Sequence, residues 1–262
     1  MLKNYLDFFI FPVLFGLSIY KNMVIDKIAI KGHEILIDQV WIPNEGLNII
    51  TSKNGGGKTK ILEYIANKYR VNHNITHISA SVQHFKCIED IAQYGKPKKA
   101  IRPPEARQFV HLYPVITHLP SNKELIQDCN SFFVRLKLDI SLDENFVQGY
   151  RLLFNHPRCK DNKRLPLSEL STGEKTAFIL WLMMHENPKP DILLLDEFDS
   201  SINDDILQIF YRQLQELSKE CQIFATTNRW RYSNDFLDNK HNHLWHTIEN
   251  GEIINKYPTQ KY

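Results

Sequence analysis

The feature that most constrains this chain is a glycine-rich loop between an apolar strand pattern and an amphipathic helix pattern. The loop (SKNGGGKT) covers residues 52–59, after the strand pattern at 47–51 and before the helix pattern at 60–69. Glycine lacks a Cβ, so three in a row let the backbone curl until several N–H groups point at one anion. The N-terminus of the following helix adds partial positive charge. This order predicts a phosphate-binding loop.

Within the loop, Lys58 and Thr59 have the positions that contact a nucleoside triphosphate. We expect Lys58 to reach the β- and γ-phosphates and the Thr59 hydroxyl to hold Mg²⁺. The backbone cradle is expected to comprise Asn54, Gly55, Gly56 and Gly57. The usual pattern begins with glycine, whereas this loop begins with Ser52. That change leaves the cradle and the lysine in place.

A second motif is an apolar strand that ends in two acids, at residues 191–197 (DILLLDE). A buried strand delivers such acids at the carboxyl edge of a sheet, where ligands bind in open α/β proteins. We expect Asp196 to hold Mg²⁺ and Glu197 to orient and deprotonate the attacking water. Alone, the motif would also fit a strand ending in solvated acids. Beside a phosphate-binding loop it predicts a hydrolytic site.

A third motif, residues 170–175 (LSTGEK), opens a helix pattern at 173–185. The Ser171 hydroxyl, Gly173 and the helix start have phosphate-binding character. The same residues also fit a plain helix cap, in which Glu174 closes a capping box with Ser171. Both interpretations remain open at this point.

The order of phosphate loop, LSTGE, LLLDE and a strand ending in ATTN resembles the ABC ATPase superfamily from about residue 23 to 254. The resemblance implies an α/β fold of the P-loop NTPase class, with a mostly parallel sheet flanked by helices. It also implies an N-terminal antiparallel β part and a modest insertion. Two ATP molecules with Mg²⁺ would be sandwiched in a head-to-tail homodimer. In that dimer, Ser171 and Gly173 would contact the γ-phosphate of the ATP held by the other subunit.

The resemblance places further residues. Gln83 is similar to the glutamine that senses Mg²⁺ and the water, and Asn228 stands where the family has its switch histidine. Asn203 stands where the family's D-loop usually has aspartate. Asparagine can donate a hydrogen bond to the γ-phosphate but cannot carry a proton, so an ATP-binding switch with little turnover remains an alternative. For adenine stacking, His33 and Trp41 are candidates, although both also fit structural roles.

We expect residues 23–262 to form one domain with an insertion at about 86–150. The apolar run at 8–20 is shorter than the roughly 20 residues of a spanning helix. We therefore interpret residues 1–22 as a packed helix or a mis-called start, with membrane insertion as the less favoured alternative. The four cysteines form no CxxC pair, which favours reduced thiols and a cytoplasmic location.

The STGEK and DEFD sequences are similar to the non-transporter branch of the superfamily. That branch includes chromosome-maintenance and recombination-repair ATPases and AAA-type ATPases of antiphage defence and OLD-type nucleases. We expect an ATP-hydrolysing dimer that controls a separately encoded effector acting on nucleic acid, in defence or repair. A subunit that drives a membrane transporter is the alternative.

Three other features remain ambiguous. The basic loop at 96–102 is either solvated or a contact for nucleic-acid phosphates. His241, His243 and His246 could bind a metal, although surface histidines in a loop explain them as well. Residues 229–232 (RWRY) mix cations and aromatic rings directly after the sensor position and could report the nucleotide state.

Overall fold

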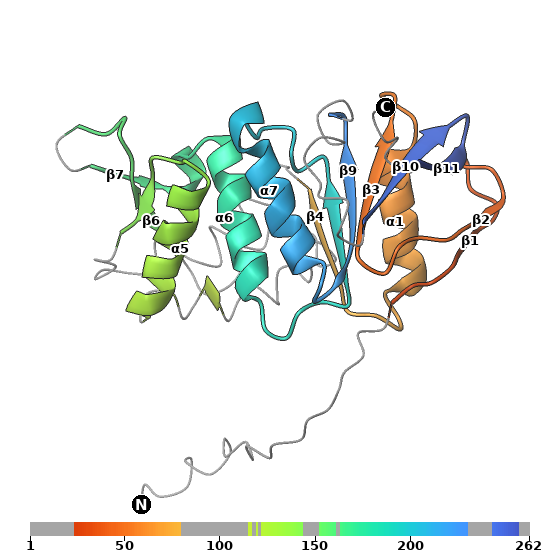
Figure 1. The fold of residues 1–262 in the computed structure, drawn as a ribbon, viewed down its shortest axis with the longest axis horizontal. Coiled ribbons are helices and arrows are strands. Elements are labelled where there is room, and N and C mark those ends of the chain that lie inside the picture. The colour runs from red at the N-terminus through yellow and green to blue at the C-terminus, as the bar shows by residue number, and fades with distance from the viewer. Residues whose placement is uncertain are drawn as a thin grey trace, which may run out of the picture.

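The computed structural model describes residues 24–79, 115–116, 119, 122–143, 152–160, 163–229 and 243–256. Its centre is a six-stranded sheet in the order β11-β10-β3-β9-β8-β4 (Figure 1). The strands are β3 Leu47–Ser52, β4 Ile75–Ser79, β8 Ile192–Asp196, β9 Gln222–Thr227, β10 His243–Glu249 and β11 Glu252–Lys256. Neighbouring strands run parallel except β11, which is antiparallel to β10. The expected α/β class with a mostly parallel sheet is therefore confirmed.

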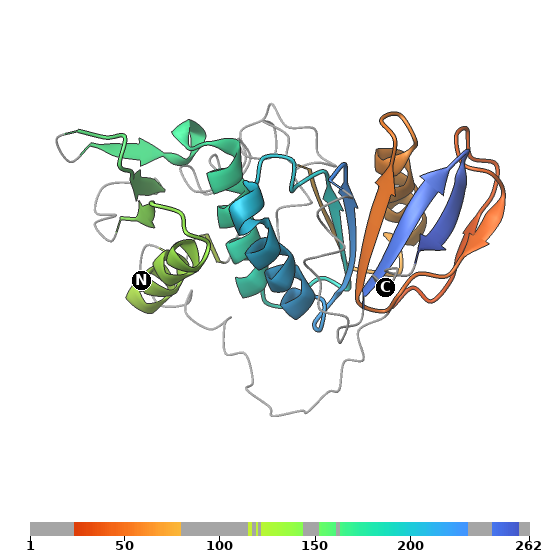
Figure 2. The ribbon, with the colours of Figure 1, turned by 45° about the horizontal axis from the view of Figure 1, so that its top comes forward.

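Helices cover both faces of this sheet (Figures 1 and 2). They are α1 Lys58–Tyr69 on one face, and α6 Thr172–His185 with α7 Asp204–Leu217 on the other. Helix α5 Lys123–Arg135 packs against α6 on the side away from the sheet (Figure 1). Alternate residues of a strand point to opposite faces. In β8, Leu193 and Leu195 pack in the cluster that contains α6 and α7, whereas Ile192 and Leu194 pack in the cluster that contains α1. A strand buried on both faces is apolar throughout, as this one is.

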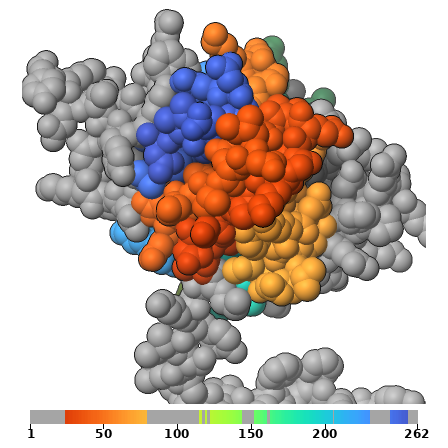
Figure 3. Space-filling model, turned by 90° about the vertical axis from the view of Figure 1, so that its right-hand side faces the viewer, coloured from red at the N-terminus to blue at the C-terminus, as the bar shows by residue number. Residues whose placement is uncertain are grey.

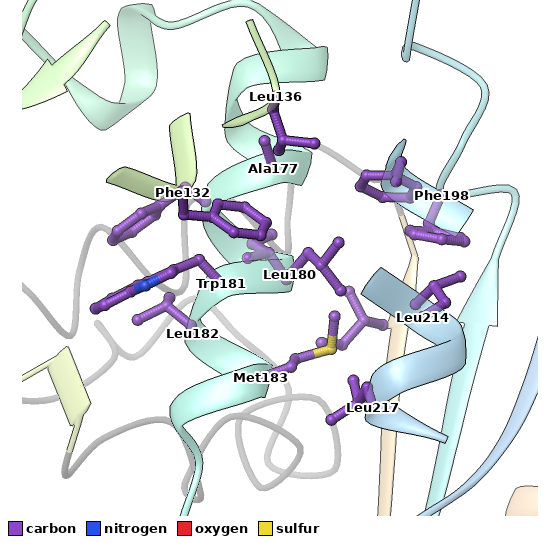
Figure 4. Packing of buried hydrophobic residues seen from close by; sticks show 14 of the residues in the cluster. Phe132, Leu136, Ala177, Leu180, Trp181, Leu182, Met183, Phe198, Leu214 and Leu217 are labelled. Carbon is purple, nitrogen blue, oxygen red and sulfur yellow. The ribbon is translucent and has the colours of Figure 1, made fainter. Parts of the chain in front are cut away.

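Helix α6 is buried on all sides over Ala177 to Met183. It contacts α5 on one side, and Figure 4 shows its side chains also facing residues of the α7 segment. Trp181 fills the space near Phe132, and its indole Nε1 donates a 2.8 Å hydrogen bond to Asp128 Oδ2 in α5. A helix that is apolar all round must be buried in this way. Helix α6 is therefore held firmly, and its N-terminus has a fixed place beside the sheet edge.

The N-terminal antiparallel part consists of β1 Ile28–Ile30 and β2 Gln39–Trp41. It forms the face shown in Figure 3, next to α1 and to the β10–β11 hairpin. The sequence pattern over residues 34–42 is typical of a strand, but β2 covers only Gln39–Trp41, because local polar contacts bend residues 34–38. Asp38 Oδ1 accepts a 2.7 Å hydrogen bond from the backbone of Gly32, and His33 Nδ1 accepts from two following backbone N–H groups.

A second antiparallel sheet contains β5 Ser141–Leu142, β6 Leu153–Asn155 and β7 Arg164–Pro166, followed by the 3₁₀ turn η3 Leu167–Glu169. The sequence pattern over residues 122–138 is typical of a helix, but α5 ends at Arg135, because Lys137 has a φ of 54° and cannot continue it. Residues 1–22 and most of the insertion expected at 86–150 lie outside the described residues, so this division of the chain stays a prediction.

Candidate nucleotide-binding site

The loop after β3 has the backbone of a phosphate cradle. Gly55 and Gly57 have φ values of 79° and 95°, in the left-handed region that favours glycine. A Cβ at Gly56 would lie 2.6 Å from Oγ of Ser52 and 2.9 Å from the carbonyl oxygen of Lys53. Only glycine therefore fits this position, because the Ser52 side chain at the entrance of the loop lies close to it.

Helix α1 begins without a side-chain cap. Its N-cap residue is Gly57, and its first turn carries no acidic residue. The first backbone N–H groups of a helix have no partner within the helix and need an acceptor from outside. An anion bound in the loop supplies that acceptor and meets the positive end of the helix dipole. The geometry therefore fits a phosphate group.

Three predicted residues from three different segments meet beside this loop. Lys58 Nζ donates a 2.7 Å hydrogen bond to Oδ1 of Asn228 and lies 3.5 Å from Oε1 of Glu197. The Nδ2 of Asn228 donates a 2.8 Å hydrogen bond to the same Oε1. Because the Lys58 side chain is only 5% exposed, these two partners, instead of water, surround its ammonium group in the free protein. Parallel strands bring the three together, because β3, β9 and β8 are adjacent and end at one edge.

The two residues expected to hold Mg²⁺ also meet. Thr59 Oγ1 donates a 2.9 Å hydrogen bond to Asp196 Oδ2. Thr226 Oγ1 donates to Asp196 Oδ1 over 2.7 Å and accepts from the backbone N–H of Glu197 over 2.8 Å. Hydroxyl and carboxylate oxygens are the ligands that Mg²⁺ prefers, so Thr59 and Asp196 fit this ion. Sequence reasoning missed Thr226, although its place in β9 beside the acid strand could have indicated it.

Glu197 has an unusual backbone. Its φ of 46° lies in the left-handed region, which a residue other than glycine rarely adopts. Such strain persists where the surrounding structure enforces it, and it gathers at functional sites. Here the hydrogen bond to Thr226 holds the backbone. The Glu197 side chain is 43% exposed, so water can reach its carboxylate.

The start of α6 shows the capping box. Ser171 Oγ donates to Glu174 Oε2 over 2.7 Å, and the backbone N–H of Glu174 donates to Ser171 Oγ over 3.3 Å. His156, after β6, lies 3.0 Å from the other oxygen of Glu174. Burial acts to raise the pKa of the Glu174 carboxyl, but the hydrogen bonds from Ser171 and His156 outweigh it and the pKa lies below its ordinary value. His156 carried no sequence signal.

Gly173 packs against the loop that follows β8, residues 199–203, here called the 199–203 loop. A Cβ at Gly173 would lie 2.6 Å from the carbonyl oxygen of Ser201. The loop begins at Asp199, which is 1% exposed and accepts hydrogen bonds from Thr227 Oγ1 (2.7 Å) and Tyr211 Oη (2.8 Å). Burial raises the pKa of Asp199 although these hydrogen bonds oppose it. The third motif is therefore in direct contact with the loop that follows the acid strand.

Two residues that the sequence offered as candidates, Trp41 for adenine stacking and His246 for metal binding, are buried in the structure. Trp41 is 2% exposed, and its Nε1 donates a 3.1 Å hydrogen bond to Nδ1 of His246, so its ring cannot stack on a nucleobase. His246 lies in β10 with 0% exposure, and its Nε2 lies 3.0 Å from Oδ1 of Asn48. The interpretation as a surface histidine is wrong for His246, because β10 pairs with β3 inside the sheet. Burial lowers the pKa of His246 to about 4.

Other predicted features lie outside the described residues: Gln83, the basic loop at 96–102, residues 230–232 and His241. Within the described ranges, no group of three or more His, Cys, Asp and Glu side chains is placed to hold a metal ion. No helix in the part of the chain that the structure describes is long and apolar enough to cross a membrane.

Comparisons with known proteins agree with these motifs. Residues 111–227 match a protein-family model described as "AAA domain, putative AbiEii toxin, Type IV TA system". The matched segment contains the LSTGE motif and the acid strand and ends with β9, whereas the phosphate-binding loop lies before it. No curated protein matches the sequence.

Two solved structures show the fold. An SMC head bound to the C-winged helix domain of ScpA is similar with a TM-score of 0.57 and 15% identity, over 89% of this chain and 98% of that chain. An SMC head domain with an extended coiled coil, bound to the C-terminal domain of ScpA derived from Pyrococcus furiosus, has a TM-score of 0.52 and 12% identity, over 89% and 96%. The chain therefore has the P-loop NTPase fold of these SMC head domains, which is consistent with its predicted resemblance to the non-transporter branch of the ABC ATPase superfamily.

Proposed function

We propose that the protein hydrolyses ATP in composite sites formed by a head-to-tail homodimer. One observation carries the proposal: Lys58, Glu197 and Asn228 come from three separate segments and lie within 3.5 Å of one another beside an uncapped helix start. A lysine, a carboxylate and an amide at a phosphate cradle match the needs of phosphoryl transfer, which are positioning and charge stabilisation.

ATP binding draws on groups that face one another in the free protein. The backbone N–H groups of residues 54–57 and the start of α1 hold the phosphates, and Lys58 turns from Asn228 and Glu197 to the β- and γ-phosphates. Thr59 and Asp196 would hold Mg²⁺ in place of their mutual hydrogen bond, and the ion would supply positive charge that neutralises the phosphate oxygens.

Hydrolysis then uses the carboxylate that Lys58 has left. Glu197 orients a water molecule in line with the γ-phosphorus and accepts its proton. The water oxygen forms the new bond to phosphorus, while the bond to the β–γ bridging oxygen breaks and that oxygen stays with ADP. Asn228 donates a hydrogen bond to the γ-phosphate or to Glu197, but it cannot serve as an acid.

The second half of each site comes from the partner subunit. We propose that Ser171, Gly173 and the first N–H groups of α6 contact the γ-phosphate bound by the other copy. The Ser171 hydroxyl must leave Glu174 to donate to a phosphate oxygen. His156 and Arg158 remain beside the Glu174 carboxylate, at 3.0 and 3.5 Å, and compensate for the lost hydrogen bond.

We further propose that the ATP-bound dimer presents a surface to a separately encoded effector that acts on nucleic acid, as in antiphage defence or repair. The two SMC heads described above were solved with part of a partner protein, ScpA. A cytoplasmic setting fits the free thiols of Cys129, Cys159 and Cys221.

A binding switch with little turnover is the second candidate. It is favoured by Asn228, which contacts both Lys58 and Glu197 but cannot titrate at the position where the family has histidine. Steady-state release of phosphate separates the candidates. A switch holds ATP for many minutes, whereas an ATPase releases phosphate at a rate that Glu197→Gln abolishes.

The solution mass of Glu197→Gln with and without Mg²⁺ and ATP tests the dimer. This substitution removes the base and keeps the shape, so a sandwiched dimer accumulates. The proposal expects the mass to double with ATP and expects Ser171→Arg to abolish the doubling. An unchanged mass, with ATP bound, would remove the role proposed for Ser171 and Gly173.

A further inference from the structure

Arg229 follows Asn228 directly and contacts the 199–203 loop instead of the nucleotide-binding cluster. Its Nη1 donates to the carbonyl oxygen of Ile202 and, over 3.2 Å, to Oδ1 of Asp204. Its Nη2 donates to the carbonyl oxygen of Ser200 over 3.3 Å. The side chain is 28% exposed. A single guanidinium thus joins the end of β9 to two backbone positions of the loop.

The backbone strengthens this connection. The N–H of Arg229 donates a 2.8 Å hydrogen bond to Oγ1 of Thr227, and that hydroxyl donates to Oδ2 of Asp199 over 2.7 Å. Tyr211 in α7 donates to the same carboxylate oxygen. The beginning of the 199–203 loop is therefore fixed by Asp199, and its later part is fixed by Arg229.

The loop meets the LSTGE motif at Gly173 through its main chain. The carbonyl oxygen of Ser201 faces Gly173 so closely that a Cβ would lie 2.6 Å from it. Ser201 lies between the two residues whose carbonyls Arg229 holds. A shift of Arg229 would therefore move the Ser201 carbonyl, which lies directly against Gly173.

Asn228 connects Arg229 to the nucleotide-binding cluster. Its side chain binds Lys58 and Glu197, the two groups whose partners change when a phosphate enters the loop. Because Arg229 is the next residue, a change in the Asn228 backbone is passed to the guanidinium without an intervening side chain.

We propose that Arg229 is a positioning residue that couples nucleotide occupancy at the chain's own phosphate loop to the position of its own LSTGE motif. The inference rests on the proposed function, in which that motif completes the site of the other subunit. Binding of ATP in one site then prepares the protein to complete the second site. Arginine suits this task because its rigid, planar fork holds several acceptors at once, whereas lysine holds them as a point charge.

Hydrogen exchange of the full chain, with Mg²⁺ and a non-hydrolysable ATP analogue, tests the coupling. In the wild type we expect the analogue to change exchange in peptides covering residues 52–59, 199–203 and 171–174. In Arg229→Met we expect the change in exchange at 52–59 to persist. We expect the changes at 199–203 and 171–174 to fall at least about 5-fold, the lower end of typical allosteric coupling between two sites. Arg229→Lys should give an intermediate result. Arg212→Met, at an exposed arginine of α7, is the matched control.

Several outcomes overturn the inference. It fails if Arg229→Met keeps the wild-type change at 171–174, or if the analogue leaves 171–174 of the wild type unaffected. If Arg229→Met does not fold, as judged by thermal unfolding, Arg229→Lys takes its place under the same criterion.

The dimer is measured separately by solution mass, so the two proposals can fail independently. Arg229-dependent exchange at 171–174 in a chain that stays monomeric would support the coupling and contradict the dimer. An ATP-driven dimer whose formation and exchange ignore Arg229 would contradict the coupling alone.

Discussion

The side-chain amide of Asn228 donates a 2.8 Å hydrogen bond to the Oε1 atom of Glu197. The two residues follow adjacent parallel strands, β9 and β8, and Lys58 contacts both. An amide thus holds the expected catalytic base in place without being able to take up a proton. Asparagine at position 228, where the family that the sequence resembles has histidine, thus orients the Glu197 carboxylate through a hydrogen bond.

Asn228→Ala should lower kcat and leave nucleotide affinity within a few-fold of the wild type. The substitution removes a hydrogen-bond donor that orients Glu197 and faces the developing charge, and losing one such donor costs about 100-fold or more in rate. Steady-state phosphate release and binding of a fluorescent ATP analogue measure the two quantities. Asn155→Ala, at an exposed asparagine in β6, is the matched control. An unchanged kcat would show that Asn228 does not take part in turnover.

Thr226→Val should destabilise the protein and weaken its Mg²⁺-dependent activity. The hydroxyl of Thr226 satisfies both Asp196 Oδ1 and the backbone N–H of Glu197, while valine keeps the shape of the side chain. Leaving buried polar groups without a partner costs about 1–3 kcal/mol each. Urea unfolding measures the free energy. Thr247→Val in β10 is the control, because the Thr247 hydroxyl is hydrogen-bonded to the Thr51 hydroxyl, 3.1 Å away, instead of to Asp196 or Glu197.

Gly173→Ala should abolish ATP-driven dimerisation while the chain still binds ATP. The added Cβ would lie 2.6 Å from the carbonyl oxygen of Ser201, a main-chain atom that cannot rotate away. The start of α6 or the 199–203 loop must shift, and the partner's γ-phosphate would lose its contacts. Solution mass in the Glu197→Gln background reports the dimer. Thr172→Ala, at the exposed neighbouring residue, should dimerise normally. Equal masses for the two variants would contradict the prediction.

Acid should destabilise the wild type through His246. Burial lowers the pKa of this imidazole to about 4 in the folded protein, whereas the unfolded value is near 6.5. The unfolded chain therefore binds a proton first, so the contribution is complete above pH 6.5 and is lost as the pH falls towards 4. The total is on the order of 3 kcal/mol.

Urea unfolding of the wild type and of His246→Gln between pH 7.5 and 4.5 measures this contribution as the difference between the two proteins. The difference is needed because Glu186 acts in the opposite direction. Burial raises the pKa of the Glu186 carboxyl to about 7, so the folded state takes up a proton there as the pH falls. Parallel stability curves for the two proteins would contradict the role of His246.

The sequence by itself predicted the central elements and the part of the candidate site that lies within one subunit. Two features are local signals: the glycine loop, which depends on backbone freedom, and the strand ending in Asp196 and Glu197, which depends on a buried run of neighbouring residues. The parallel order of the strands then made it predictable that the ends of β3, β8 and β9 would meet.

Only the tertiary structure decided the partners of these residues. Nothing local indicates that Thr226 bonds to the Asp196 carboxylate and the Glu197 backbone, that His156 contacts Glu174, or that Arg229 reaches the carbonyls of the 199–203 loop. These contacts join residues that the strand order and the packing of α6 bring together. The physical reason is that periodicity reports which face of an element is buried, whereas a hydrogen bond depends on which other element lies opposite that face.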